Sequence, residues 1–190
     1  MSFKTVPQMF QHVVSEKPSL KTFYTKTENG WEGVELADLQ VMVEDFANGL
    51  KNLGINDNDK VAIIGANSRK WAISDYAIAH IRAVSVPVYP TLIPTQSQYV
   101  VEHSESKIAI VQDEVQLDKV YPLINDANSN LNTIIIMDDE YSGGKDNVIN
   151  FGDVFNMKDQ VHDIRALSAT VQENDLLTLI YTSGTTGNPK

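Results

Sequence analysis

The stretch Val61-Ala-Ile-Ile-Gly-Ala-Asn-Ser68 decides the fold of this chain. It begins with an unbroken apolar run, which is typical of a strand that is covered on both faces of its sheet. The residues from Gly65 to Asn67 predict a short loop. Ser68 is a good helix N-cap, so we expect a largely buried helix over residues 69–83.

The same alternation continues along the chain. Further strands and helices are predicted as follows: strands at residues 85–89, 107–111 and 133–137, and helices at residues 95–104, capped by Thr95, and 115–127. Strands that alternate with helices of this length predict an α/β fold, with a parallel open sheet of βαβ units, right-handed crossovers and flanking helices. Pro87 has no backbone donor, so it should lie at a strand start or on an edge strand.

The residues before Val61 predict a helix, a β-hairpin and a second helix. The first helix covers residues 6–16 and is capped by Thr5, and its apolar face is Val6, Met9, Phe10, Val13 and Val14. Asn29-Gly30 lies between two β-prone runs, residues 22–26 and 31–34, which is a strong hairpin signal. The second helix covers residues 36–53 and is followed by Gly54, and its apolar face is Leu36, Leu39, Met42, Val43, Phe46, Leu50 and Leu53.

The residues after the last βα unit are less regular. Residues 138–147 predict an exposed loop, residues 148–155 a short strand, and residues 161–167 a helix. The apolar run at residues 176–181 predicts a buried strand. We expect one incomplete domain made of four segments: residues 1–60 packing on the sheet, 61–137 as its βαβ core, 138–175 as an irregular connection, and 176–190 as a strand with a phosphate loop.

The chain ends on Thr182-Ser-Gly-Thr-Thr-Gly-Asn-Pro-Lys190, which has the chemistry of a phosphate site. Glycines let backbone N–H groups approach phosphate oxygens, hydroxyls donate further hydrogen bonds, and the lysine supplies a point charge. The spacing is not that of the common NTPase P-loop. The alternative is a plain Ser/Thr/Gly linker, which does not usually follow a strand. The candidate phosphate-binding residues are Thr182, Ser183, Gly184, Thr185, Thr186, Gly187 and Lys190.

Composition limits the remaining choices. The chain has 190 residues, a net charge of −10 and no cysteine. The negative charge argues against nucleic acid or an anionic membrane as a partner of the whole surface. Without cysteine there is no disulfide, thiol catalysis or cysteine-ligated zinc. The N-terminal residues contain no apolar core of signal-peptide length, and no apolar run approaches the length of a membrane span, so we expect a cytoplasmic protein.

The ending resembles the phosphate-loop signature of adenylate-forming enzymes, namely acyl-CoA synthetases, luciferases and the adenylation domains of peptide synthetases. Residues 182–190 match that signature at each fixed position. Residues 31–53, 61–68, 71–76 and 84–91 are similar to the opening segments of long-chain fatty acyl-CoA synthetases, the run Val86-Pro-Val-Tyr-Pro-Thr91 most of all. One departure is Arg82, since many relatives carry a glycine at this position, just before Ala83.

The resemblance implies an ATP-dependent acyl-CoA ligase that makes an acyl-adenylate and then a thioester, with ATP, Mg²⁺, CoA and a fatty acid as its small molecules. The loop at residues 182–190 would hold the β- and γ-phosphates. The resemblance also implies that the catalytic and metal-binding residues lie beyond Lys190, so we expect a fragment that is inactive alone and assign it no catalytic or metal residue. It leaves room for peripheral membrane contact. The open alternatives are an aryl- or amino-acid-activating relative and a non-catalytic α/β scaffold module.

Other candidate residues have plainer interpretations. His80 lies on the buried helix and is expected to be a hydrogen-bonded core residue rather than a metal ligand. Asp138 to Glu140 read as a solvated strand end, and Trp71 as a packing residue. Tyr89 and Thr91 follow a strand, where open α/β sheets bind ligands, although a structural turn at that point is the simpler reading.

Overall fold

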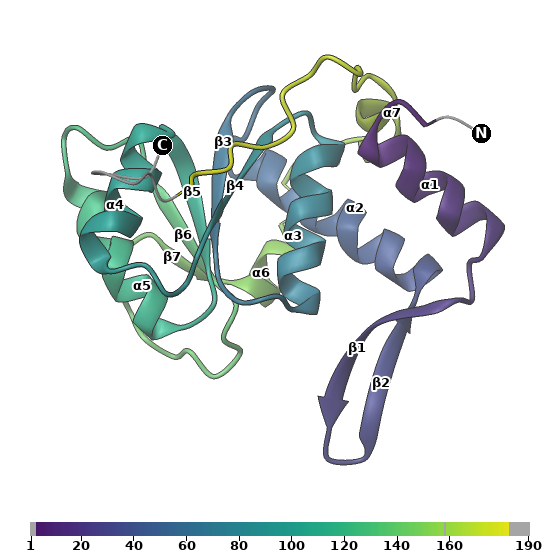
Figure 1. Cartoon of the computed structure of the whole chain (residues 1–190), viewed down its shortest axis with the longest axis horizontal. Coiled ribbons are helices and arrows are strands. Elements are labelled where there is room, and N and C mark those ends of the chain that lie inside the picture. The colour runs from purple at the N-terminus through teal and green to yellow at the C-terminus, as the bar shows by residue number, and fades with distance from the viewer. Residues whose placement is uncertain (1–2, 158, 183–190) are drawn as a thin grey trace.

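A five-stranded parallel sheet organises the chain, and its strand order is β4-β3-β5-β6-β7 (Figure 1). The computed structural model describes residues 3–157 and 159–182. The strands are β3 (Lys60–Ile64), β4 (Val84–Val88), β5 (Ser106–Val111), β6 (Thr133–Ile136) and β7 (Val148–Asn150). The helices that follow them are α3 (Arg69–His80), α4 (Pro94–His103), α5 (Glu114–Val120), the 3₁₀ helix η1 (Tyr121–Asn125), α6 (Phe151–Val154) and α7 (Ile164–Ala169). The predicted α/β class with a parallel βαβ sheet is confirmed.

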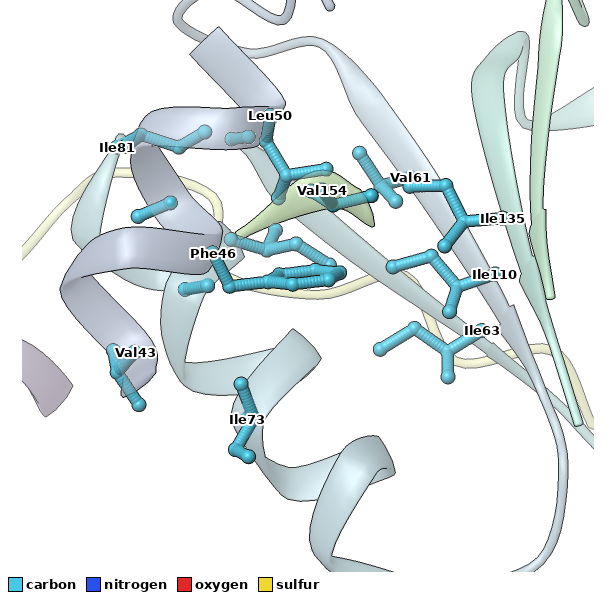
Figure 2. Packing of buried hydrophobic residues seen from close by; sticks show 14 of the residues in the cluster. Val43, Phe46, Leu50, Val61, Ile63, Ile73, Ile81, Ile110, Ile135 and Val154 are labelled. Atoms are coloured by element: carbon cyan, nitrogen blue, oxygen red, sulfur yellow. The ribbon is translucent and has the colours of Figure 1, made fainter. Parts of the chain in front are cut away.

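Helices cover both faces of the sheet, because successive residues of each strand point to opposite sides. One face packs on α2 (Leu36–Asn52), α3 and α6, and Figure 2 shows Phe46 of α2 reaching from the helix toward Ile63 and Ile110. The Phe46 and Phe151 rings stack at 4.4 Å between centroids. The other face packs on α4 and α5, which lie on the opposite side of the sheet in Figure 1. The strand residues of this second face include Ala62, Ile64, Val111 and Ile136.

The N-terminal elements largely follow their sequence pattern. Helix α1 (Val6–Glu16) begins where predicted, and the Thr5 hydroxyl accepts a hydrogen bond from the Gln8 amide. Strands β1 (Lys21–Thr27) and β2 (Gly30–Glu35) form the predicted antiparallel hairpin, which projects from the body in Figure 1. Its turn differs in detail, because Thr27 pairs with Gly30 and the loop is therefore Glu28-Asn29. Gly30 has a φ of +121°, which requires glycine at this position.

The predicted apolar face of α1 is only half right. Phe10 and Val14 are buried, whereas Met9 and Val13 are exposed. Helix α1 lies at the edge of the body, so it can bury only a narrow stripe against α2, α3 and α7 (Ile164–Ala169). Helix α2 agrees better, and Gly54 just beyond it has a φ of +86°, as a left-handed helix terminator should.

Three helix boundaries were predicted wrongly. Helix α3 ends at His80 rather than residue 83, because Arg82 adopts a left-handed backbone with a φ of 57°. Helix α4 is not capped by Thr95; its N-cap is Ile93, and Pro94 supplies the preset first-turn φ instead. The helix predicted over residues 115–127 divides into α5 and η1, and the tighter η1 carries a proline, Pro122, in its first turn.

The buried strand predicted at residues 176–181 is also wrong. This segment forms only one isolated bridge, between Thr178 and Ser85 of β4, and Leu176, Leu177 and Ile180 are exposed. Pro87 explains part of this result. Every second residue of β4 directs its N–H group toward residues 176–181. Ser85 donates in this way, but the next such residue is Pro87, which has no N–H. Pro87 does lie on the edge strand of the five-stranded sheet, as predicted.

Candidate functional site

The predicted phosphate loop is reached through residues 175–182, which we call the approach segment. It runs beside β4, the edge strand of the sheet, and ends close to α4 (Figure 1). The Ser85 amide donates to the Leu177 carbonyl at 3.1 Å, and the Leu179 amide donates to the Ser85 carbonyl at 2.9 Å. The segment therefore runs parallel to β4 and heads toward the carboxyl ends of the strands, where open α/β sheets bind their ligands.

Tyr181 anchors the far end of the approach segment. Its hydroxyl shares a 2.8 Å hydrogen bond with Nδ1 of His103, the last residue of α4. The His103 ring also stacks on Tyr99, with centroids 5.3 Å apart, and meets the Tyr181 ring edge-on at 5.7 Å. Partial burial, with a smaller contribution from Tyr99, raises the pKa of the Tyr181 phenol above its ordinary value.

Arg82 anchors the near end. Its Nε and Nη2 donate to the two carboxylate oxygens of Asp175 at 2.9 and 3.0 Å, and Nη1 donates to Asp57 at 3.0 Å. Asp175 also accepts a 2.8 Å hydrogen bond from the Gln172 amide. The hydrogen bond from Arg82 is the main cause that lowers the pKa of Asp175, so its carboxylate is ionised under ordinary conditions.

The approach segment ends at Thr182, the first residue of the predicted phosphate loop, directly after the Tyr181 contact with α4. The remaining candidates, Ser183, Gly184, Thr185, Thr186, Gly187 and Lys190, lie outside the described residues. Their role in binding phosphate stays a prediction.

A small cleft lies beside the end of the approach segment. It measures about 200 Å³ and is lined by Gly65, Asn67, Trp71, Pro87, Val88, Tyr89, Pro90 and Ile180. Tyr89, one of the two residues singled out after its strand, lines the cleft and is 65% exposed, whereas Thr91 is not part of the lining. Trp71 was expected only to cover a strand, but it also lines this cleft from the first turn of α3. Its position just after the Gly65–Asn67 loop was the signal for that role.

Sequence reasoning missed Gln112, which joins two loops at the switch point of the sheet. The chain runs from β3 to β4 on one side and places β5 on the other, so the loops after β3 and β5 lead to helices on opposite faces of the sheet. The Gln112 amide donates to the Ile64 carbonyl at 2.9 Å, and its Oε1 accepts from the Ala66 amide at 2.7 Å. A Cβ on Gly65 would lie 3.0 Å from the Gln112 Cβ, so this approach favours glycine.

Two other candidates are structural. His80 is 2% exposed, and its Nδ1 donates to the Tyr76 carbonyl at 2.6 Å, which confirms the prediction of a hydrogen-bonded core residue. Asp139 is exposed and pairs with Lys70 at 2.6 Å. Within the described ranges, no group of three or more His, Asp or Glu side chains could hold a metal ion, and no helix is both long and apolar enough to cross a bilayer.

Sequence comparisons identify relatives along nearly the whole chain. A family model described as AMP-binding enzyme matches residues 3–190. A long-chain-fatty-acid–CoA ligase of Rattus norvegicus is 27% identical over 188 residues, which cover 98% of this chain and 26% of the relative. A long-chain-fatty-acid–CoA ligase of Mycobacterium bovis is 28% identical over 182 residues, which cover 96% of this chain and 29% of the relative. The chain spans about a quarter of the length of these curated relatives.

Solved structures of adenylate-forming ligases share the fold of this chain. An anthranilate CoA ligase, solved in complex with anthranoyl-AMP, superposes with a TM-score of 0.76 at 19% identity, covering 97% of this chain and 33% of that one. A long-chain-fatty-acid-CoA ligase from Archaeoglobus fulgidus superposes with a TM-score of 0.75 at 15% identity, covering 98% of this chain and 35% of that one. At such identities the likeness concerns the fold, and the family follows from the match along the sequence. The chain belongs to the AMP-binding enzyme family.

Proposed function

We propose that this chain is the N-terminal part of an ATP-dependent ligase that activates a long-chain fatty acid as acyl-AMP and transfers it to CoA. The observation that carries the proposal is the phosphate-loop signature that begins at Thr182. It directly follows a segment that runs parallel to β4 and is bonded to α4 through Tyr181. The curated relatives described above are long-chain ligases, which favours a long-chain acid over an aryl or amino acid.

In the proposed reaction a carboxylate oxygen attacks the α-phosphorus of ATP, and pyrophosphate leaves. The thiol of CoA then attacks the acyl carbon, and AMP leaves. Negative charge grows on the pyrophosphate during the first step, so fixed N–H, hydroxyl and ammonium donors at residues 182–190 would stabilise the transition state more than the ground state. This is the role that we assign to the loop.

The described residues supply the platform for this loop rather than the reacting groups. Mg²⁺ would enter with the phosphates of ATP; since the described ranges offer no cluster of carboxylates and imidazoles for it, we derive no step through the metal. We also propose that residues 1–190 do not catalyse ligation alone, and that the protein acts in the cytoplasm. In this proposal residues 1–60, 61–137, 138–175 and 176–190 together form one incomplete domain.

The test is an ATP–pyrophosphate exchange assay on the full-length gene product with palmitate, benzoate and a mixture of amino acids. We expect exchange with palmitate. Lys190→Ala should slow it about ten- to a hundredfold, because one charge-assisted contact contributes about 1.5–3 kcal/mol. The control is Lys26→Ala, which removes an exposed lysine on the hairpin and should change nothing.

Exchange driven only by benzoate or an amino acid would replace the long-chain assignment with the aryl or amino-acid alternative. Unchanged kinetics in Lys190→Ala would remove the assigned role of the loop. Exchange by purified residues 1–190 would show that the segment is not inactive alone.

A further inference from the structure

Arg82 is an unusual residue for its backbone position. Its φ of 57° lies in the left-handed region, which residues with a Cβ adopt at an energetic cost and glycine adopts freely. It occupies the turn between α3 and β4, where its carbonyl accepts a hydrogen bond from the Asn58 amide. A residue with a strained backbone persists where its side-chain contacts offset the strain. The contacts of the Arg82 side chain therefore indicate its role.

Those contacts point to the approach segment. The guanidinium grips Asp175 through two bonds of 2.9 and 3.0 Å, in the fork geometry that arginine and carboxylate share. The Arg82 and Asp175 side chains are 28% and 22% exposed, so solvent screens this pair less than a fully exposed one. The other carboxylate partner, Asp57, is 49% exposed and lies in the turn before β3.

Asp175 is well placed to set the register of the approach segment. It is followed directly by the stretch in which Leu177 and Leu179 bond to Ser85. These bonds form a single isolated bridge, and Pro87 lacks the N–H group that would donate the next backbone hydrogen bond to the segment. With so few backbone bonds, side-chain anchors must fix where the segment lies. Arg82 holds one end of it, and His103 holds the other through Tyr181.

We propose that Arg82 and Asp175 are positioning residues, which fix the approach segment against β4 and thereby place the start of the phosphate loop. The proposal rests on the proposed function for its role in catalysis, but the anchoring itself does not depend on it. Arg82 touches no phosphate in this proposal. It acts through Asp175, Leu177 and Thr178 on the position of Thr182.

The structure offers matched variants for the test. Arg82→Gly removes the guanidinium and relieves the backbone strain, so the turn itself should survive. Asp175→Asn keeps the shape of the side chain and removes its charge. Asp57→Asn is the control, because it removes the other partner of Arg82 and leaves the Asp175 pair in place.

The first readout is amide hydrogen exchange of the 190-residue chain. We expect exchange at the Leu179 amide to be at least about tenfold faster in Arg82→Gly and Asp175→Asn, with α2 and α3 unchanged, and no difference in Asp57→Asn. Unchanged exchange at Leu179 would overturn the proposal. Faster exchange throughout the chain would also overturn it, because it would show a contribution to overall stability alone.

The second readout uses the full-length gene product. In Arg82→Gly and Asp175→Asn, kcat/KM for MgATP in adenylation should fall about tenfold while the KM for the acid stays constant. Faster exchange at Leu179 with unchanged MgATP kinetics would overturn the positioning role and leave the proposed function intact. If the wild-type protein adenylates no acid, the proposed function fails, and the exchange result still decides whether the anchor exists.

Discussion

The side chains of His103 and Tyr181 share a hydrogen bond of 2.8 Å although they are 78 residues apart in the sequence. His103 ends α4, and Tyr181 immediately precedes Thr182. The bond therefore joins the end of a helix that packs on the sheet to the residue from which the predicted phosphate loop begins. It closes the approach segment at the end opposite Arg82.

Removing this bond should loosen the loop without disturbing the core. Tyr181→Phe keeps the ring contacts with His103 and deletes the hydroxyl. A hydrogen bond of this kind contributes about 1 kcal/mol, so MgATP should bind the full-length gene product about fivefold more weakly, as measured by calorimetry.

The matched control for Tyr181 is Tyr99→Phe. It deletes a hydroxyl on the other ring that contacts His103, one that makes no hydrogen bond in the described part of the chain. Equal affinities in the two variants would contradict a special role for Tyr181.

Gly49 of α2 should tolerate no side chain. A Cβ there would overlap the carbonyl oxygen and Cγ1 of Val154, on the short helix α6 that Figure 2 shows against α2. We expect Gly49→Ala to lower the free energy of unfolding by about 1–3 kcal/mol, the usual cost of overpacking, as measured by urea denaturation.

Gly152→Ala is the control for that measurement, because it adds the same methyl group on α6 itself, where nothing lies within 4 Å. Its stability should equal or slightly exceed that of the wild type, since alanine favours helix. If both variants were equally stable, the close approach of α2 and α6 would be wrong.

Much of this fold could be predicted because local signals and burial agree. The run from Val61 to Ile64 is fully buried on both faces, and Ser68 caps α3 as expected, accepting from the Trp71 amide. A parallel sheet also gathers the loops after its strands at its carboxyl end, and Tyr89, singled out for this reason, lines the cleft there.

The errors lie where a distant contact or a proline decides the local structure. Thr95 is a good cap in isolation, but the N-cap is Ile93, two residues earlier, and Pro94 begins the helix. Nothing near Arg82 indicates that it would end α3 in a left-handed turn, because its partner Asp175 is 93 residues away. The run at residues 176–181 is apolar enough for a buried strand, yet its neighbour presents Pro87. Gln112 was missed for a similar reason, since its partner Ala66 lies on another loop.

Asp75 should be an example of a charge that destabilises the fold at neutral pH. Burial raises the pKa of its half-buried carboxyl above the ordinary value of 3.8. The folded state therefore binds this proton more tightly than the unfolded state does. The stability that the bound proton gives to the fold is lost as pH rises from 3.8 through the raised pKa of the folded state. Asp75→Asn should stabilise the chain at pH 7 by about 0.5–1 kcal/mol, a modest gain because solvent screens a half-buried group.

Urea denaturation at pH 7 and pH 4.5 checks this prediction. The gap between Asp75→Asn and the wild type should narrow at the lower pH, where the wild-type carboxyl takes up its proton in the folded state. An asparagine variant that is less stable at pH 7 would show that the carboxylate makes a favourable contact instead.

His80 should give the fold a loss of stability on mild acidification. Burial is the main cause that lowers the pKa of its imidazole below the ordinary value of 6.5, and the Tyr76 carbonyl and the Glu44 carboxylate offset this only in part. The edge of the Phe10 ring, 5.4 Å away between centroids, adds no charge to compensate for burial. Below pH 6.5 the unfolded chain therefore binds a proton at His80 that the folded chain resists, and the free energy of unfolding falls as pH falls from 7 toward 5.5. His80→Gln should flatten this part of the pH profile in urea denaturation, whereas His12→Gln, which leaves His80 in place, should keep it. An identical pH slope in wild type and His80→Gln would mean that His80 is not the group responsible.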